Sequence, residues 1–228
     1  MRIHGANVVG VEMDEEGMEL DGLEHAFRTE PNVKLLYVIP TFQNPSGKTM
    51  SLARRKAIYA LCVKYGVMIL EDNPYGELRF RGEDIPTFKS MDDEGIVIYN
   101  GSYSKVLSAG MRIGFVMAQK DVLQRLTVAK QFSDCHSNIF FQIVTDEWLR
   151  TADVDAHIAK IRKIYRDRCD FMLKLLDEHM DKRVTYTRPD GGLFLWCTLP
   201  EGCDSQELAD LALRKGVAFV PGRDFMVD

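Results

Sequence analysis

Short apolar runs alternate with amphipathic stretches along the first half of the chain. Residues 34–39 form a nearly continuous apolar run that ends at Pro40, which is typical of a parallel strand buried on both faces. Ser51 is suited to cap a helix that continues to Lys64 and is closed by Gly66. The same patterns predict further strands at 8–11, 67–70, 96–99 and 113–117, and a short helix at 20–27.

From Val122 onward the pattern is helical for a long stretch. Residues 155–180 carry apolar side chains at helical spacing and predict one long helix. Beyond it, the sequence predicts strands at 184–187 and 193–198, a helix at 204–216 and a last strand at 217–220. We therefore expect an α/β fold: a large domain with a mainly parallel sheet over 1–154, then an interdomain helix and part of a small α+β domain over 155–228.

Polar clusters occur where the predicted strands end. They are the segments 41–47, 71–76 and 100–105, together with 110–114 just before the next strand. Because open α/β sheets bind ligands at the carboxyl ends of their strands, we expect these clusters to meet at one edge of the sheet. Together they offer an amide, a carboxylate with a phenol, a hydroxyl with an amine, and a guanidinium.

Each cluster also has a structural explanation when it is taken alone. The segment 44–47 has the composition of an ordinary turn. Helix caps, a half-buried packing residue and solvated surface charges would account for the others, which are Asp72, Tyr75, Ser102, Ser104, Lys105 and Arg112. The chemical interpretation depends on their occurrence together, at successive strand ends and in this order.

In combination, these groups suit a reaction that uses an aldehyde cofactor with a pyridine ring. A lysine such as Lys105 forms an imine with the aldehyde. A carboxylate such as Asp72 keeps the pyridine nitrogen protonated, so that the ring withdraws electrons from a carbanion. Hydroxyl and guanidinium groups such as Ser102 and Arg112 bind a phosphate.

With these residues the chain resembles the pyridoxal-phosphate-dependent aminotransferases of fold type I, class I/II. The matching motifs extend over nearly the whole chain and are Asn44-Pro45-x-Gly47, Asp72-x-x-Tyr75, Ser102-x-Ser104-Lys105, Gly110-x-Arg112-x-Gly114, 191–196 and 220–222. The spacing from Lys105 to Arg112, together with segment 71–78, is similar to the branch that holds 2-aminoadipate and broad-specificity aminotransferases.

The resemblance implies pyridoxal 5′-phosphate as the cofactor and a role for each matching residue. Lys105 corresponds to the Schiff-base lysine and Asp72 to the partner of the pyridine nitrogen. Tyr75 and Asn44 correspond to ligands of the cofactor's O3′ oxygen, and Asn44 also to a substrate contact. Lys105, Asp72 and Tyr75 are thus the expected catalytic residues.

The phosphate site implied by the resemblance consists of Ser102 and Arg112, with Ser104 at a position that varies in the family. The implied substrates are an amino acid and a 2-oxo acid. Family members form homodimers that build each site with residues from the neighbouring subunit. We therefore expect a homodimer here as well.

Family members are longer than this chain. Before the position of Met1 they carry a phosphate-binding turn and an aromatic residue that stacks on the pyridine, and after that of Asp228 an arginine that binds the substrate α-carboxylate. We therefore expect a chain truncated at both ends, which holds the latter part of a seven-stranded, mainly parallel sheet. We also expect the chain by itself to be inactive as a transaminase.

The function implied by the resemblance is amino-group transfer with ping-pong kinetics, in which Lys105 acts as the general base. Three alternatives remain open. They are a carbon–sulfur lyase on the same scaffold, an effector-binding domain of a transcription regulator, and an inert fragment of a split gene. A winged-helix segment encoded upstream would favour the regulator.

Composition and charge bear on the partners, the cellular location and the metal content that we expect. The net charge of −5 predicts neither a nucleic-acid nor an anionic-membrane partner, and no apolar run approaches the length of a bilayer. The cysteines are odd in number and show no CxxC spacing, which predicts reduced, mostly buried thiols and a cytoplasmic location. The histidines, His4 among them, are scattered singly, so we predict no metal site.

Overall fold

The computed structural model describes residues 5–226, so that His4 and the ends of the chain at Met1 and Asp228 lie outside the described residues. The helices are α1 (Leu20–Thr29), α2 (Leu52–Tyr65), α3 (Lys120–Ser133), α4 (Ile139–Thr151), α5 (Val154–His179) and α6 (Ser205–Arg214). The strands are β1 (Met13–Asp14), β2 (Gly17–Met18), β3 (Leu35–Val38), β4 (Met68–Asp72), β5 (Val97–Ser102), β6 (Gly114–Met117), β7 (Thr185–Tyr186) and β8 (Cys197–Thr198). Short 3-10 helices are η2 (Gly76–Leu78), η3 (Lys89–Met91), η4 (Ala109–Met111) and η5 (Gly222–Phe225).

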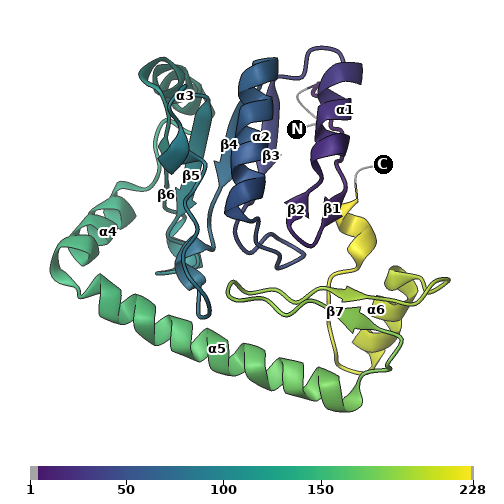
Figure 1. Ribbon diagram of the computed structural model, residues 1–228. Helices are drawn as coiled ribbons and strands as arrows, with labels where there is room; N and C mark the ends of the chain where they lie inside the picture. Colours follow the sequence, from purple (N-terminus) through teal and green to yellow (C-terminus); the bar gives the residue numbers. More distant parts are fainter. Residues whose placement is uncertain (1–4, 227–228) are drawn as a thin grey trace.

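A four-stranded sheet in the order β3-β4-β5-β6 forms the centre of the fold (Figure 1). Strands β3, β4 and β5 are parallel, and β6 pairs antiparallel with β5. The α/β class, the mainly parallel sheet and the positions of these four strands confirm the predictions. The register places Asp72 directly opposite Asn100, so that the ends of β4 and β5 lie side by side.

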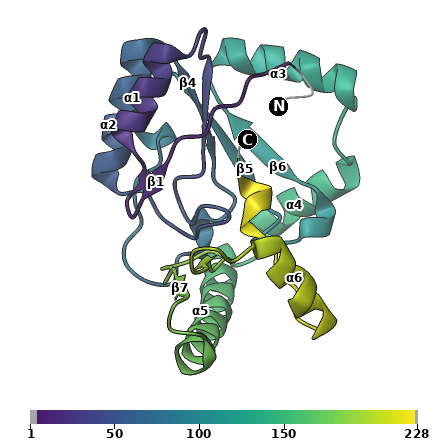
Figure 2. The same ribbon diagram turned by 90° about the vertical axis from the view of Figure 1, so that its right-hand side faces the viewer.

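Helices α1 and α2 cover one face of this sheet (Figure 2). The fully buried side chains between them include Leu23 of α1, Ile58 of α2, and Ile69 and Val97 of the central strands. Burial of this kind is the main favourable term in folding, at roughly 25 cal/mol for each Å² of apolar surface removed from water. The core therefore fixes the strands whose ends carry the predicted site.

The prediction that residues 34–39 are buried on both faces is wrong. Leu36 and Val38 point into the core, but Leu35 and Tyr37 are 42% and 43% exposed. The physical reason is that helices of the described chain pack against only one face of β3, which is also an edge strand of the described sheet. The side chains on the other face therefore stay exposed. An apolar run thus overstated the burial of this strand.

Helix α2 begins and ends as its sequence predicts. The Ser51 hydroxyl accepts a hydrogen bond from the backbone N–H of Arg54, which satisfies one of the free donors of the first turn. Gly66 closes the helix in the left-handed conformation at φ 66°, where a residue without a Cβ has no steric penalty. This helix leads directly into β4.

The later half of the chain is mostly helical, as predicted. The long helix α5 lies along the carboxyl end of the sheet, where it contacts η2 (Figure 1). Asp153 caps its first turn, and Asp204 does the same for α6. Strands β7 and β8 form an antiparallel pair of two residues each, which is shorter than the sequence predicted.

Three further expectations are corrected by the structure. Residues 8–11 and 217–220 are not strands, and Val9, Val217 and Val220 are exposed. A strand needs backbone partners on a neighbouring strand, and within residues 5–226 none pairs with either segment. The cysteines are all free, but only Cys62 is buried, because the others lie on weakly covered parts of the later half, namely Cys135, Cys169, Cys197 and Cys203.

No helix within residues 5–226 combines the length and the apolar character that crossing a membrane would require.

Candidate active site

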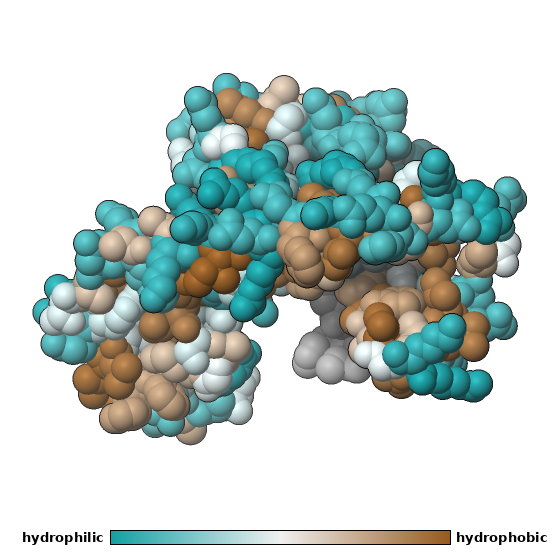
Figure 3. All heavy atoms as spheres, turned by 90° about the horizontal axis from the view of Figure 1, so that it is seen from below, coloured by the Kyte–Doolittle hydropathy of each residue, from teal (hydrophilic) through white to brown (hydrophobic). Residues whose placement is uncertain are grey.

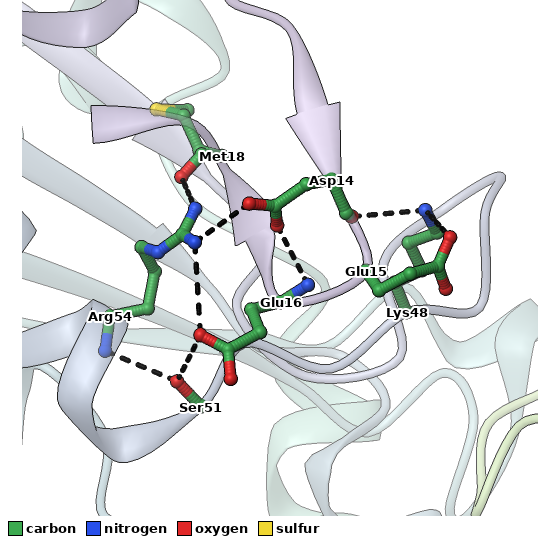
Figure 4. A network of polar contacts seen from close by, with 7 residues as sticks. All are labelled: Asp14, Glu15, Glu16, Met18, Lys48, Ser51 and Arg54. Carbon is green, nitrogen blue, oxygen red and sulfur yellow. Dashed lines mark hydrogen bonds and ion pairs between the residues drawn. The ribbon is translucent and has the colours of Figure 1, made fainter. Parts of the chain in front are cut away.

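The loop that carries Asn44 follows β3 and closes on itself. The backbone N–H of Gly47 donates to the Gln43 carbonyl at 2.6 Å, and the N–H of Gln43 donates to the Lys48 carbonyl at 2.8 Å. The Lys48 side chain then ties the loop to the β1–β2 hairpin, because its Nζ donates to the Asp14 carbonyl at 2.9 Å (Figure 4). The position of Asn44 is therefore set by contacts on both sides of the loop.

Arg54, in the first turn of α2, fastens the same hairpin (Figure 4). Its guanidinium pairs with the Asp14 carboxylate at 2.7 Å and donates to the Met18 carbonyl at 2.5 Å. The Glu16 carboxylate lies 3.7 Å from the same guanidinium. Since Asp14 contacts both Arg54 and, through its carbonyl, Lys48, the hairpin joins α2 to the Asn44 loop.

Arg55 holds the loop from inside the core. Its side chain is fully buried and donates to the carbonyl of Pro40 and to the Thr41 hydroxyl, each at 2.9 Å. It also donates to the Met50 carbonyl at the other end of the loop, at 3.1 Å. Burial lowers the pKa of Arg55 to about 10. No sequence motif indicated this role, because a helix position alone does not show which loop the side chain contacts.

Asp72 lies at the carboxyl end of β4 with both of its oxygens engaged. The Tyr37 hydroxyl donates to Oδ2 and the Asn100 amide to Oδ1, each at 2.8 Å. Both partners are donors, so the site suits an ionised carboxylate, and its remaining lone pairs can accept a third donor. The pKa of Tyr37 is raised, mainly by burial of the phenol and then by its hydrogen bond to Asp72.

Tyr37 and Asn100 are site residues that no sequence motif indicated. Asn100 is opposite Asp72 in the register of the sheet, and Tyr37 lies on the next strand on the same face. Side chains alternate between the two faces of a strand, so the sequence shows which residues of one strand share a face. Which residues of neighbouring strands lie beside each other becomes clear only when the register between the strands is known.

Tyr75 is buried beside Asp72 and Asn44. Its ring packs edge-on against Phe194 at a centroid distance of 5.4 Å. Burial is the main cause that raises the pKa of Tyr75, the charge of Asp72 raises it further, and the Asn44 amide acts in the opposite direction. Asp72 and the Asn44 amide therefore lie close enough to Tyr75 to act on its hydroxyl.

The predicted phosphate residues also lie together. The Ser102 hydroxyl accepts a hydrogen bond from the backbone N–H of Ser104 at 3.1 Å. The Arg112 guanidinium donates to the Ser104 hydroxyl at 3.4 Å and to the Ala109 carbonyl at 3.2 Å. Two hydroxyls and a guanidinium on adjacent turns match the donors that bind a phosphate group.

Lys105 lies in the turn after β5, between Ser104 and the segment that leads to Arg112, and its side chain is half-buried. Within residues 5–226 its amine has no hydrogen bond or ion pair with another residue. The donor set therefore fits pyridoxal phosphate: a carboxylate for the ring nitrogen, an amide and a phenol, hydroxyls with a guanidinium for the phosphate, and an amine that is not tied to another side chain.

Two cavities lie apart from these residues. One, of about 470 Å³, is lined by α5 and nearby loops, and much of its charge is already paired, as in the contacts of Arg81 with Asp170 and of Arg188 with Asp177. The other, of about 500 Å³, lies between β6, α3 and α4 and reaches Ile113, next to Arg112. Neither cavity is lined by the predicted catalytic residues Lys105, Asp72 and Tyr75. The candidate active site is therefore defined by the side-chain contacts described above.

Comparison with known proteins shows which family the chain belongs to. The family model for aminotransferase class I and II matches residues 1–228, and the chain belongs to this family. Aromatic-amino-acid aminotransferase 1 of Thermococcus litoralis is 44% identical over 221 residues, which are 95% of this chain and 53% of that protein. The 2-aminoadipate transaminase of Thermus thermophilus is 38% identical over 230 residues, which are 100% of this chain and 57% of that protein.

A solved structure shows the same fold. The kynurenine aminotransferase of Pyrococcus horikoshii, crystallised in complex with PMP, superposes with a TM-score of 0.91 at 41% identity. The alignment covers 95% of this chain and 55% of that one. The resemblance to the aminotransferases and the expected fold are thus confirmed, while the chain spans little more than half the length of the relatives it matches.

Proposed function

We propose that the protein is a pyridoxal-phosphate-dependent aminotransferase that moves an amino group from an amino acid to a 2-oxo acid. The observation that carries this proposal is the Asp72 carboxylate, which is held by two donors at the same sheet edge as Asn44, Tyr75 and the Lys105 turn. Family membership supports it independently.

When bound, the cofactor supplies an aldehyde for amines and a ring that withdraws electrons. Asp72 would accept a hydrogen bond from the ring nitrogen and would stabilise the proton there by its charge. Asn44 and Tyr75 would donate to the ring's phenolate oxygen, and Ser102 and Arg112, with Ser104, would hold the phosphate. The Lys105 Nζ would be the amine that holds the cofactor's aldehyde carbon and, as a free amine, the base that accepts the proton of the substrate's α-carbon.

The substitution Asp72→Asn tests this assignment in the protein that contains the cofactor. An amide lacks the charge that keeps the ring nitrogen protonated, so we expect cofactor binding to persist while turnover falls on the order of a hundredfold or more. Asp93→Asn, at an exposed carboxylate, is the matched control. Near-normal turnover in Asp72→Asn would show that Asp72 is only structural.

Product analysis separates transamination from the alternatives. Transamination converts the second substrate, a 2-oxo acid, into an amino acid, whereas a carbon–sulfur lyase releases a thiol without consuming a 2-oxo acid. An effector-binding domain or an inert fragment would yield neither product. The assay uses a panel of amino acid and 2-oxo acid pairs with the native protein.

We further propose a homodimer that associates through α3 and α4. This segment exposes large apolar side chains, and Figure 3 shows hydrophobic surface on the lobe at the left, where α4 lies. They are Phe132, Ile139, Phe140 and Ile143, with exposed fractions of 88%, 55%, 67% and 63%. Contiguous apolar surface of this kind is common at interfaces between proteins.

Sedimentation velocity of Phe140→Asp tests this interface. A charge in a desolvated contact should weaken association by roughly tenfold or more. Leu213→Asp, at a side chain of α6 that is 65% exposed, is the control and should leave the assembly unchanged. A dimer equally stable in both variants, or a native monomer with full activity, would refute the proposal.

We also propose a cytoplasmic location and a domain boundary at 154/155. The five free cysteines support a reducing compartment. The boundary is supported by the start of the long helix α5 at Val154, directly after the helical part of the larger unit. Limited proteolysis whose first cuts fall within a few residues of 154/155 would support this boundary, and first cuts elsewhere in the described chain would contradict it.

A further inference from the structure

Helix α5 holds the turn that follows Lys105. The Nε2 atom of His157, in the first turns of α5, lies 2.7 Å from the backbone carbonyl oxygen of Val106. A carbonyl oxygen only accepts hydrogen bonds, so Nε2 carries a proton in this contact and donates it. The two residues are 51 positions apart in the sequence, so the contact joins α5 to the residue next to Lys105.

The side chain of Val106 packs against a buried apolar cluster that contains the ring of Tyr75. Ile161 and Tyr165, which lie one and two turns beyond His157 on α5, pack against the same cluster. Val106 is therefore joined to α5 directly by its backbone carbonyl, and its side chain shares with α5 the apolar packing around Tyr75.

Two features fix the geometry of this contact. The imidazole of His157 packs edge-on against Trp148 of α4, with ring centroids 5.6 Å apart, which restrains its orientation. The Lys105 turn is closed by the backbone N–H groups of Leu107 and Ser108, which both donate to the Tyr103 carbonyl. The turn is thus closed internally, and His157 sets its place relative to the helix.

We propose that His157 is a positioning residue for Lys105, which it places through the Val106 carbonyl. This inference rests on the proposed function. The Lys105 amine stands at the end of a flexible four-carbon chain, so its reach toward a bound cofactor depends on where the backbone of residues 103–108 is fixed. A small displacement of a reacting group can slow a reaction strongly. The hydrogen bond from His157 to Val106 can therefore affect the reaction although His157 itself lies outside the site.

A purely structural role for His157 is the competing explanation, and α5 offers a matched control. The Nε of Arg162 donates to the backbone carbonyl of Glu77 at 2.7 Å. This second tether has the same length and comes from the same helix, but it reaches the η2 turn after Tyr75. If α5 only needs to be docked, then loss of either tether should have the same consequences.

The experiment compares His157→Leu, His157→Gln and Arg162→Met in the full-length protein. Leucine removes the donor, whereas the glutamine amide extends to about the same position and can donate to Val106. Hydrogen exchange of the amides in 103–108 should accelerate roughly three- to tenfold in His157→Leu, the factor expected for one hydrogen bond of typical net strength. His157→Gln should restore protection, and Arg162→Met should leave this segment unchanged at a comparable melting temperature.

The second measurement is covalent attachment of pyridoxal phosphate to Lys105, trapped with borohydride and mapped by mass spectrometry. The concentration of cofactor needed for half-maximal attachment should rise several-fold in His157→Leu and return in His157→Gln. Equal effects of His157→Leu and Arg162→Met on both readouts, or no effect of His157→Leu, would overturn the proposal. Absence of attachment in the native protein would instead overturn the proposed function, and this inference with it.

Discussion

The two halves of the chain differ sharply in how well they are packed. From α1 to β5, large side chains such as Leu23, Ile58 and Phe88 are fully buried between the helices and the sheet. From β6 to η5, within the described residues, α3 and α6 contribute no buried residue and all four residues of β6 are exposed. The first half therefore has a core of its own, and the second half presents apolar surface.

This difference explains where the site is built. Asn44, Asp72 and Tyr75 stand on strands and loops whose other side chains are anchored in the core, and Arg55 ties the Asn44 loop directly to it. The second half instead supplies α5, which bears on the site through His157 and Arg162. The well-packed first half thus carries Asn44, Asp72 and Tyr75. The less buried second half contacts the turn after Lys105 and the η2 turn through α5.

Two phenylalanines, one in each half, should differ most in their contribution to the free energy of unfolding. Phe88 is fully buried, so Phe88→Ala should lower the free energy of unfolding by about 3–5 kcal/mol through lost packing and the cavity left behind. Phe171 of α5 is 62% exposed, and Phe171→Ala should change it by about 0.5 kcal/mol or less. Urea unfolding measures both, and similar losses would refute the contrast.

The next effect concerns Asp92, whose fully buried side chain serves the packed half. It accepts hydrogen bonds from the Lys89 amine at 2.8 Å and from the backbone N–H groups of Ile96 and Val97 at 2.9 and 3.1 Å. Burial raises the pKa of Asp92, but these donors, Lys89 first, outweigh it and hold the pKa below its ordinary value.

A carboxyl whose pKa is lowered by folding stabilises the protein above its ordinary pKa near 4, and this contribution is lost as the pH falls below it. Asp92→Asn should therefore cost about 2–3 kcal/mol at pH 7 and flatten the decline of stability between pH 5 and 2. The neighbouring exposed Asp93→Asn is the control. An unchanged pH profile in Asp92→Asn would contradict this assignment.

The smallest effect compares helix caps in the two halves. Ser51→Ala removes the hydroxyl that caps α2 and should cost about 1 kcal/mol in global unfolding, because α2 is part of the core. Asp204→Ala removes the corresponding cap of α6, which has no buried residue. We expect it to increase hydrogen exchange locally in α6 with a smaller change in global stability. The reverse ranking would argue against the difference between the halves.

Local signals in the sequence predicted much of the fold. The Ser51 cap, the closing Gly66 and the apolar runs located α2 and the four sheet strands, because caps and strand runs depend on neighbouring residues. The errors lay where tertiary contacts decide. Segments 8–11 and 217–220 have strand-like composition but no partner within the described chain, and β3 has helices on one face only.

The candidate site shows the same division. Motifs identified the groups that can meet a cofactor, such as Asp72 and Lys105, because each follows a strand end in the sequence. The residues that hold those groups were missed, because their partners are 28 to 51 positions away: Asn100 and Tyr37 for Asp72, and His157 for the Lys105 turn. Only the strand register and the path of α5 bring them together.

The proposed role of Lys105 is tested by mapping the lysine that carries the cofactor. The protein is incubated with pyridoxal phosphate, reduced with borohydride and digested, and the modified peptide is identified by mass spectrometry. We expect the modification to lie on Lys105 and to disappear in Lys105→Arg, while Lys89→Arg, at an amine already paired with Asp92, leaves it intact. Modification centred on any other lysine, or persisting at full yield in Lys105→Arg, would contradict this role.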